Sequence, residues 1–151
     1  MAWTKLIPKY LGIPYYSNIH HIKSDNIALV GKGNYIEINK ATKQFPNNRI
    51  GIDCSGLVCQ LLQLPYNPRK TNANMLTSVP LSHQISLSDI KSGDLIRQKN
   101  GHHLVLVIKK IGEKIEYIHS SRKTKGVVKA TVNIDDKEFF REGAWRLFLF
   151  D

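Results

Sequence analysis

The second half of the chain alternates short apolar runs with turn residues, a pattern that predicts consecutive β-strands. The expected strands are residues 95–97, 102 or 103 to 108, 115–119, 126–132 and 145–150. Gly112 lies between the second and third of these, where it predicts a tight turn. Strands joined by such short turns are expected to pair in an antiparallel meander.

The first half of the chain instead predicts helices. Residues 4–12 predict a short helix that breaks near Pro8, because proline disrupts helical hydrogen bonding. Asp53 is a good N-cap for a second helix, and Pro65 would end it. The apolar face of this helix would consist of Leu57, Val58, Leu61, Leu62 and Leu64. Because helices precede the meander, the order of elements predicts an α+β fold.

The remaining segments are loop-like. Residues 66–92 are polar, with one short helix expected around residues 72–77. Residues 17–50 predict a loop-rich insertion with a possible strand at 34–38. A chain of 151 residues without repeats is long enough for one core, so we expect a single domain over residues 1–151.

The formal net charge of +10 favours contact with an anionic surface, such as nucleic acid, phospholipid headgroups or an acidic wall polymer. No nucleic-acid-binding motif accompanies the scattered basic residues, so we expect no nucleic acid partner and a solvated basic surface. No apolar run approaches the roughly 18 residues that cross a bilayer. The N-terminus lacks the features of a secretory signal, so export would need a signal-independent route or a leader removed beforehand.

The sequence contains two cysteines, too few for a disulfide framework. If Cys54 and Cys59 share a helix, their side chains point roughly 140° apart, which is poor geometry for a bridge. A zinc site needs about four ligands, and neither His-His pair of the chain has helical ligand spacing. We therefore predict no metal and no cofactor, and we interpret Cys59 as a core thiol.

Cys54 would be the first residue of the helix that Asp53 caps. The first N–H groups of a helix lack internal partners and present partial positive charge. A thiolate at that position is stabilised and its pKa falls, as a cysteine nucleophile requires. Ser55 and Gly56 are small enough to let a substrate approach, and the Cys54 N–H would help to hold an oxyanion.

A cysteine nucleophile also needs a base, and three of the six histidines flank the predicted hairpin. If Ile108 pairs with Lys114, His103 lies directly opposite His119 on one sheet face, within about 5.5 Å at Cβ. One imidazole would act as the base and the other would orient it. A register slip of one residue would place His102 there instead. The alternative interpretation of each ring is a satisfied, half-buried strand histidine.

Four blocks of the sequence resemble the NlpC-type cell-wall cysteine peptidases, a papain-like family of bacteria and phages. The blocks follow the family order with similar gaps, and they are Asp53–Val58, Ser92–Leu95, His103–Ile108 and Tyr117–Ser121. The resemblance implies a papain-like fold in which N-terminal helices pack on a central antiparallel sheet of about five to six strands.

By the same resemblance, Cys54 is the nucleophile, His103 is the base and His119 orients it. The segment Leu11–Tyr15 is similar to one whose tyrosine, here Tyr15, lies beside the thiol. The residues that would line the site are Asp53, Ser55 and His102. The implied activity is hydrolysis of peptidoglycan stem peptides, typically between γ-D-glutamate and the diamino acid, so the expected partner is peptidoglycan or a muropeptide.

The chain departs from the family pattern in two places. Tyr16-Ser17-Asn18 and a long segment replace a Gly-rich stretch, and Val105 stands where the family has a small residue. These departures leave two alternatives open. One is a papain-like hydrolase or acyltransferase with a non-wall substrate, as in toxins, and the other is a non-catalytic binding module on the same scaffold. Analysis of muropeptide products and of thiol reactivity would separate the three.

Overall fold

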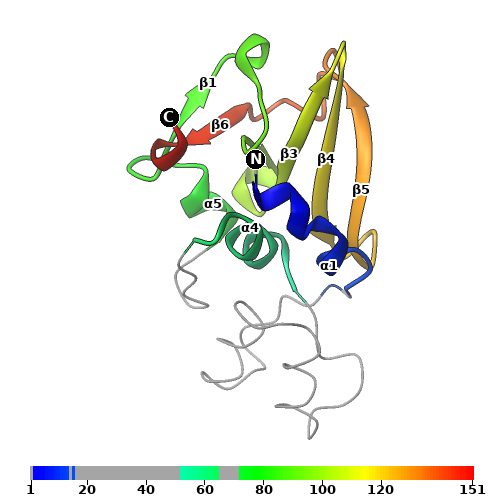
Figure 1. Cartoon of the computed structure of the whole chain (residues 1–151). Coiled ribbons are helices and arrows are strands. Elements are labelled where there is room, and N and C mark those ends of the chain that lie inside the picture. Colours follow the sequence, from blue (N-terminus) through cyan, green and yellow to red (C-terminus); the bar gives the residue numbers. More distant parts are fainter. Residues whose placement is uncertain (1, 14, 16–51, 65–71) are drawn as a thin grey trace, which may run out of the picture. The chain divides into compact units, whose positions relative to one another are not determined.

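The computed structural model describes residues 2–13, 15, 52–64 and 72–151 (Figure 1). The predicted insertion at 17–50 and its possible strand at 34–38 lie outside these residues.

The chain divides into two compact units, which are described one at a time. The first contains residues 72–119 and 129–151. The described residues of the second are 2–13, 15, 52–64 and 120–128.

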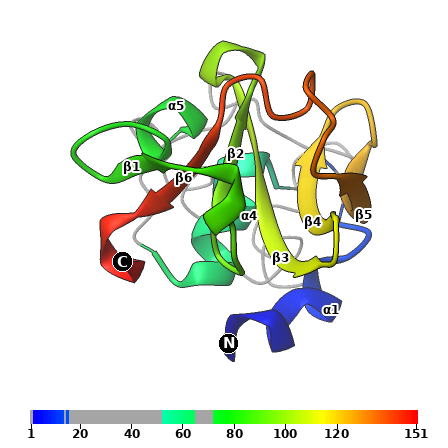
Figure 2. The ribbon, with the colours of Figure 1, turned by 90° about the horizontal axis from the view of Figure 1, so that it is seen from above.

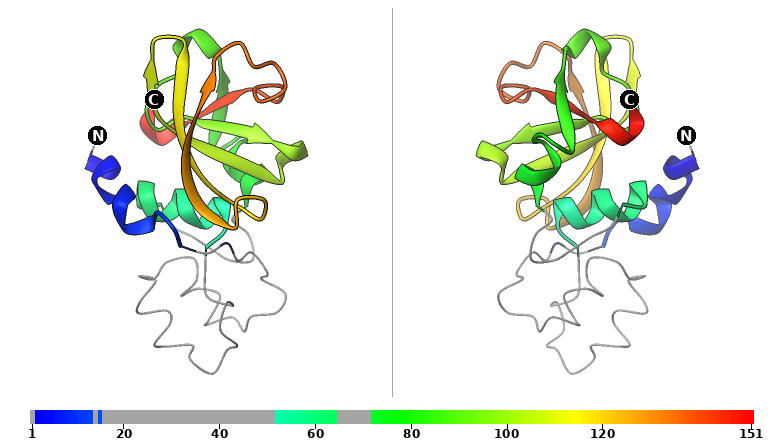
Figure 3. Two further views of the ribbon diagram at one scale, coloured as in Figure 1. Left: turned by 90° about the vertical axis from the view of Figure 1, so that its right-hand side faces the viewer. Right: turned by 90° about the vertical axis from the view of Figure 1, so that its left-hand side faces the viewer.

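Six strands form a sheet in the order β1-β6-β2-β3-β4-β5, and most of their residues belong to the first unit (Figure 2). The strand pairs with an assigned register are antiparallel, which together with the helices confirms the α+β prediction. The sheet is strongly twisted, as sheets of L-residues are (Figure 3). The strands are β1 (Ser82–Ile85), β2 (Leu95–Gln98), β3 (His103–Ile111), β4 (Lys114–Ser121), β5 (Gly126–Asn133) and β6 (Ala144–Leu147).

An apolar cluster on one face of the sheet forms the core of the first unit. Ile96 of β2 pairs with Val105 of β3 and with Ala144 of β6, so all three side chains lie on the same face. All three are fully buried. Tyr117 of β4 packs against this cluster, and its ring also contacts the ring of His119.

A buried ion pair joins the start of β2 to β6. Arg146 donates from Nε to Asp94 Oδ1 at 2.8 Å and from Nη2 to Asp94 Oδ2 at 2.9 Å. The Asp94 side chain is only 1% exposed, and it also accepts from the backbone N–H of Lys91. Gly93 adopts a φ of +94°, a conformation that favours glycine, so the Gly93-Asp94 block of the family resemblance forms a structural turn.

The second unit contains the N-terminal helices and α4 (Cys54–Leu62). A 3-10 helix at Ala2–Leu6 leads directly into α1 (Ile7–Tyr10), so the predicted break near Pro8 is wrong. Pro8 lies in the first turn of α1, where a missing N–H is tolerated. Tyr10 donates from its hydroxyl to Gln60 Oε1 at 3.1 Å and so joins α1 to α4.

Two more sequence predictions need correction, one for a missing strand and one for the end of the last strand. Residues 66–92 contain β1 in addition to the expected short helix, which is α5 (Ala73–Leu76). The closing strand stops at Leu147, and a 3-10 helix, Phe148–Phe150, follows it. β1 reads Ser-His-Gln-Ile, so its polar residues concealed a strand that is held by pairing with β6.

The register predicted for the β3–β4 hairpin is also wrong. β3 continues to Ile111, which pairs with Lys114 around a two-residue turn. Further from the turn, a bulge lies between Lys109 and Val107, and on its far side Val107 pairs with Tyr117. From Val107 towards the start of β3 the pairing is therefore shifted by two residues from the prediction, and on the turn side of the bulge by three. The even shift keeps the side chains near the start of β3 on their predicted face.

Candidate active site

Cys54 is the first residue of α4, as predicted. Asp53 has extended backbone angles, and its Oδ1 accepts a hydrogen bond from the Gly56 N–H at 2.7 Å. Its carbonyl accepts from the Leu57 N–H at 2.9 Å, which begins the helical hydrogen bonding. Cys54 is therefore the first residue of a capped helix, the end at which free N–H groups favour a thiolate. The residue is 8% exposed.

The side chain of Ser55 completes this cap. Its hydroxyl donates to Asp53 Oδ1 at 3.3 Å, and the residue is buried. Burial raises the pKa of the Asp53 carboxyl, and the hydrogen bonds from Gly56 and Ser55 oppose that rise. Asp53 and Ser55 thus act together on the geometry of the helix start that carries Cys54.

Cys59 lies one and a half turns along the same helix and is 2% exposed. Burial, and secondarily the charge of Asp53, raises the pKa of its thiol to about 12. Neither cysteine of the chain forms a disulfide. Cys59 therefore stays protonated near neutral pH and packs in the core, which confirms its predicted place there.

Tyr15 lies beside the residues that precede Cys54. It forms a parallel bridge with Ile52, and its N–H donates to the carbonyl of Lys125 at 3.3 Å. Ile52 is also held from β4, because Ser120 donates from its hydroxyl to the Ile52 carbonyl at 2.7 Å. Ser120 directly follows His119 in the chain. Ile52, which precedes the helix start, is thus held by a backbone bridge to Tyr15 and by the hydroxyl of Ser120.

The structure brings His103 and His119 together in the first unit. Nε2 of His103 and Nδ1 of His119 are 2.9 Å apart, a hydrogen bond between two ring nitrogens. The ring centroids are 5.1 Å apart, and the His119 ring also contacts Tyr117 edge-on. The two-residue register shift makes the pair diagonal neighbours on one face, still within reach of each other. The bond leaves Nδ1 of His103 for a different partner.

The surroundings of both imidazoles lower their pKa and so disfavour the protonated form. Burial, the neighbouring His119 and the charge of Lys99 lower the pKa of His103 to about 4. Burial and the charge of Lys99 also lower the pKa of His119. A neutral ring can accept a proton, so His103 has the protonation state of a general base near neutral pH. His102 is exposed and belongs to the turn before β3.

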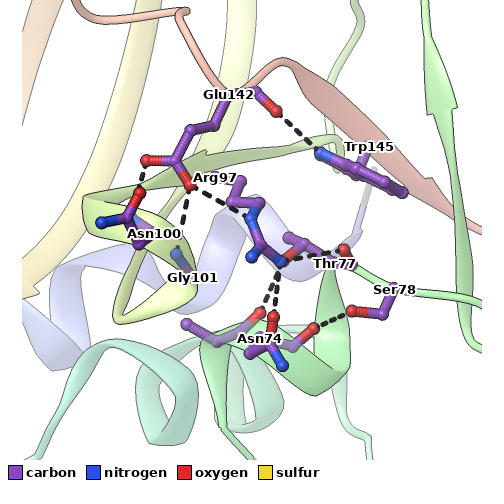
Figure 4. A network of polar contacts seen from close by, with 9 residues as sticks. Asn74, Thr77, Ser78, Arg97, Asn100, Gly101, Glu142 and Trp145 are labelled. Atoms are coloured by element: carbon purple, nitrogen blue, oxygen red, sulfur yellow. Dashed lines mark hydrogen bonds and ion pairs between the residues drawn. The ribbon is translucent and has the colours of Figure 1, made fainter.

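The turn Lys99–Gly101, just before β3, is a feature that the sequence reasoning missed. Glu142 accepts hydrogen bonds from the N–H groups of Asn100 and Gly101, and Arg97 donates to the same carboxylate (Figure 4). Arg97 and Glu142 are 45 residues apart, and no local pattern links them.

No group of three or more metal-binding side chains occurs in the part of the chain that the structure describes. None of the described helices is long and apolar enough to cross a membrane.

No family model matches the chain, and no curated protein matches its sequence. Among solved structures, the chain is similar to the peptidoglycan hydrolase RipB of Mycobacterium tuberculosis, with a TM-score of 0.54 and 16% sequence identity. The match covers 87% of this chain and 57% of the RipB chain. The chain thus spans little more than half of that structure. At this identity the likeness shows that the two proteins share a fold.

Proposed function

We propose that the chain is a cysteine hydrolase of the NlpC type that cleaves an amide bond in peptidoglycan stem peptides. The bond that best fits the proposal joins γ-D-glutamate to the diamino acid. The observation that carries the proposal is the hydrogen bond between His103 and His119, because it supplies the base and the orienting group that a cysteine nucleophile requires. The capped helix start at Cys54 and the fold shared with a peptidoglycan hydrolase support it.

In the proposed reaction, Nδ1 of His103 takes the proton of the Cys54 thiol. The sulfur attacks the carbonyl carbon of the scissile amide, and a carbon–sulfur bond forms while the oxygen takes negative charge. N–H groups at the helix start would stabilise that oxyanion. The carbon–nitrogen bond then breaks, and protonated His103 gives its proton to the leaving amine.

Water completes the cycle. His103 removes a proton from water, the resulting hydroxide attacks the thioester carbonyl, and the carbon–sulfur bond breaks while protonated His103 returns its proton to the sulfur. The products are a carboxylic acid and the regenerated thiol. His119 would not exchange protons with substrate; its bond to Nε2 would fix the tautomer and orientation of His103, the role of the third member of a triad.

Digestion of purified peptidoglycan, with mass analysis of the fragments, tests the proposal. The wild-type protein should release fragments cut at one amide bond of the stem. Cys54→Ala should release none, while Cys59→Ala, a matched change in the same helix, should retain the same product pattern. Intact peptidoglycan combined with turnover of a small amide or ester would favour a non-wall substrate instead. Equal digestion by Cys54→Ala would reject Cys54 as the nucleophile.

A further inference from the structure

The turn Lys99–Gly101 has an unusual backbone. Three consecutive residues have positive φ: Lys99 at 52°, Asn100 at 57° and Gly101 at 82°. Residues with a Cβ rarely adopt this conformation, and two in succession need external support. Strained backbone of this kind is concentrated at functional sites.

Glu142 supplies that support. Its Oε2 accepts from the Asn100 N–H at 2.7 Å, and its Oε1 accepts from the Gly101 N–H and from Arg97 Nε, both at 3.1 Å (Figure 4). Arg97 is held in turn by Asn74, whose Oδ1 accepts from Nη1 at 2.7 Å. These bonds fix the turn to β2 and to the segment before β6.

The same bonds engage both oxygens of the Glu142 carboxylate. Glu142 already forms an ion pair with the Arg97 guanidinium, and no ion pair joins it to Lys99 among the described residues. Among the residues that the structure describes, no ion pair involves the Lys99 ammonium, and the residue is exposed. The network therefore fixes the backbone of the turn that carries Lys99, while no described ion pair involves its ammonium.

The turn that carries Lys99 lies at the same end of the sheet as His103. Gln98 pairs with His103 across β2 and β3, so the turn leaves the sheet at the end where His103 begins its strand. The charge of Lys99 lowers the pKa of both His103 and His119. A positive charge here opposes protonation of the base, which the proposed reaction requires. An anion bound to Lys99 would remove this opposition.

We propose that Lys99, held by the Glu142–Arg97 network, binds a substrate carboxylate next to the scissile amide. The inference rests on the proposed function, which supplies the carboxylate: a γ-linked D-glutamate presents a free α-carboxylate beside the bond to be cut. Binding would place the negative charge where the cation lacks a partner. The substrate itself would then favour the protonated imidazole that the leaving amine needs.

The test uses two probe peptides that differ at one group. The first is L-alanyl-γ-D-glutamyl-L-lysine amide, in which the D-glutamate carries the only carboxylate. The second carries a carboxamide in its place. Binding is measured by calorimetry on the full chain with Cys54→Ala, so that no probe is consumed. The added variants are Lys99→Met, Lys99→Arg and, as a matched exposed lysine on β3, Lys110→Met.

We expect the carboxylate probe to bind roughly tenfold more tightly than the carboxamide, the usual effect of one charge-assisted contact. Lys99→Met should abolish that ratio, whereas Lys99→Arg and Lys110→Met should preserve it. An unchanged ratio in Lys99→Met, or no binding of either probe, would overturn the inference. Hydrolysis of the carboxylate probe by the chain with Cys54 intact tests the proposed function separately. Lys99-dependent binding without hydrolysis would uphold the site and reject the enzyme.

Discussion

At the scale of single residues, the environment assigns different chemistry to like side chains. Cys54 and Cys59 share one helix, but only Cys54 lies at its start, and burial raises the pKa of the Cys59 thiol to about 12. His102 and His103 are neighbours, yet one is exposed and the other bonds to His119. These contrasts allow each role to be tested with a matched partner in the same element.

The two thiols should differ in reactivity. Near neutral pH almost no Cys59 is ionised, because its pKa of about 12 lies far above the pH. We expect iodoacetamide to label Cys54 at least about a hundredfold faster than Cys59, since the thiolate is the reactive form. Peptide mapping by mass spectrometry gives both rates, with Cys54→Ala as the control that reports Cys59 alone. Equally slow labelling of the two would favour the non-catalytic module.

His103 should also make stability depend on pH. Its pKa is about 4 in the folded chain against an ordinary value of 6.5, so between these values the unfolded chain binds more protons. The free energy of unfolding should therefore fall as the pH falls through this window, by up to about 3 kcal/mol. When the free energy of unfolding is measured with urea at several pH values in this window, it should depend less steeply on pH in His103→Asn. An identical slope in the variant would contradict the lowered pKa.

At the scale of elements, short apolar runs bounded by turn residues were enough to predict β2 to β5. β1 was missed because Ser82-His83-Gln84-Ile85 carries little apolar signal and depends on its pairing with β6. The register of the hairpin was missed because the bulge after Val107 depends on tertiary contacts. The histidine pair survived that error, since a shift of two residues keeps both rings on one face.

The turn before β3 should tolerate no Cβ at Gly101. A Cβ built there would lie 2.6 Å from Arg97 Nη2 and 2.8 Å from Asn74 Oδ1, both held in the network. Gly101→Ala should therefore lower the free energy of unfolding by about 2–3 kcal/mol. Gly112→Ala is the control: its φ is also positive, but a Cβ meets nothing within 4 Å, so only about 1 kcal/mol is expected. Equal losses of stability in Gly101→Ala and Gly112→Ala, measured by thermal unfolding, would show that Arg97 and Asn74 move aside at little cost.

The ion pair of Asp94 and Arg146 should be important for folding. Asp94→Asn leaves a largely buried guanidinium without its counter-ion and should destabilise the chain by about 3–5 kcal/mol. The exposed pair of Glu138 and Arg141 offers a control, because Glu138→Gln should change stability little. Denaturant unfolding of both variants gives the comparison, and a small loss in Asp94→Asn would contradict the structural role of this turn.

At the scale of the whole molecule, the order of helices and strands predicted the α+β class, which the sheet and the likeness to RipB confirm. The catalytic roles of Cys54, His103 and His119, and the place of Tyr15 beside the thiol, remain proposals that join residues far apart in the chain. The contact between Arg97 and Glu142 could not be predicted, because no local sequence pattern indicates a partner 45 positions away. Such pairs become visible only when the fold brings them together.

The central claim is that His103 activates Cys54, and the pH profile of Cys54 alkylation tests it without any assumption about substrate. We predict that the wild-type thiol reacts with iodoacetamide well below the ordinary cysteine pKa of about 8.5, and that His103→Asn moves the profile up towards that value. His102→Asn, the exposed neighbour, should leave the profile unchanged. Superimposable profiles for the wild type and His103→Asn would contradict the account.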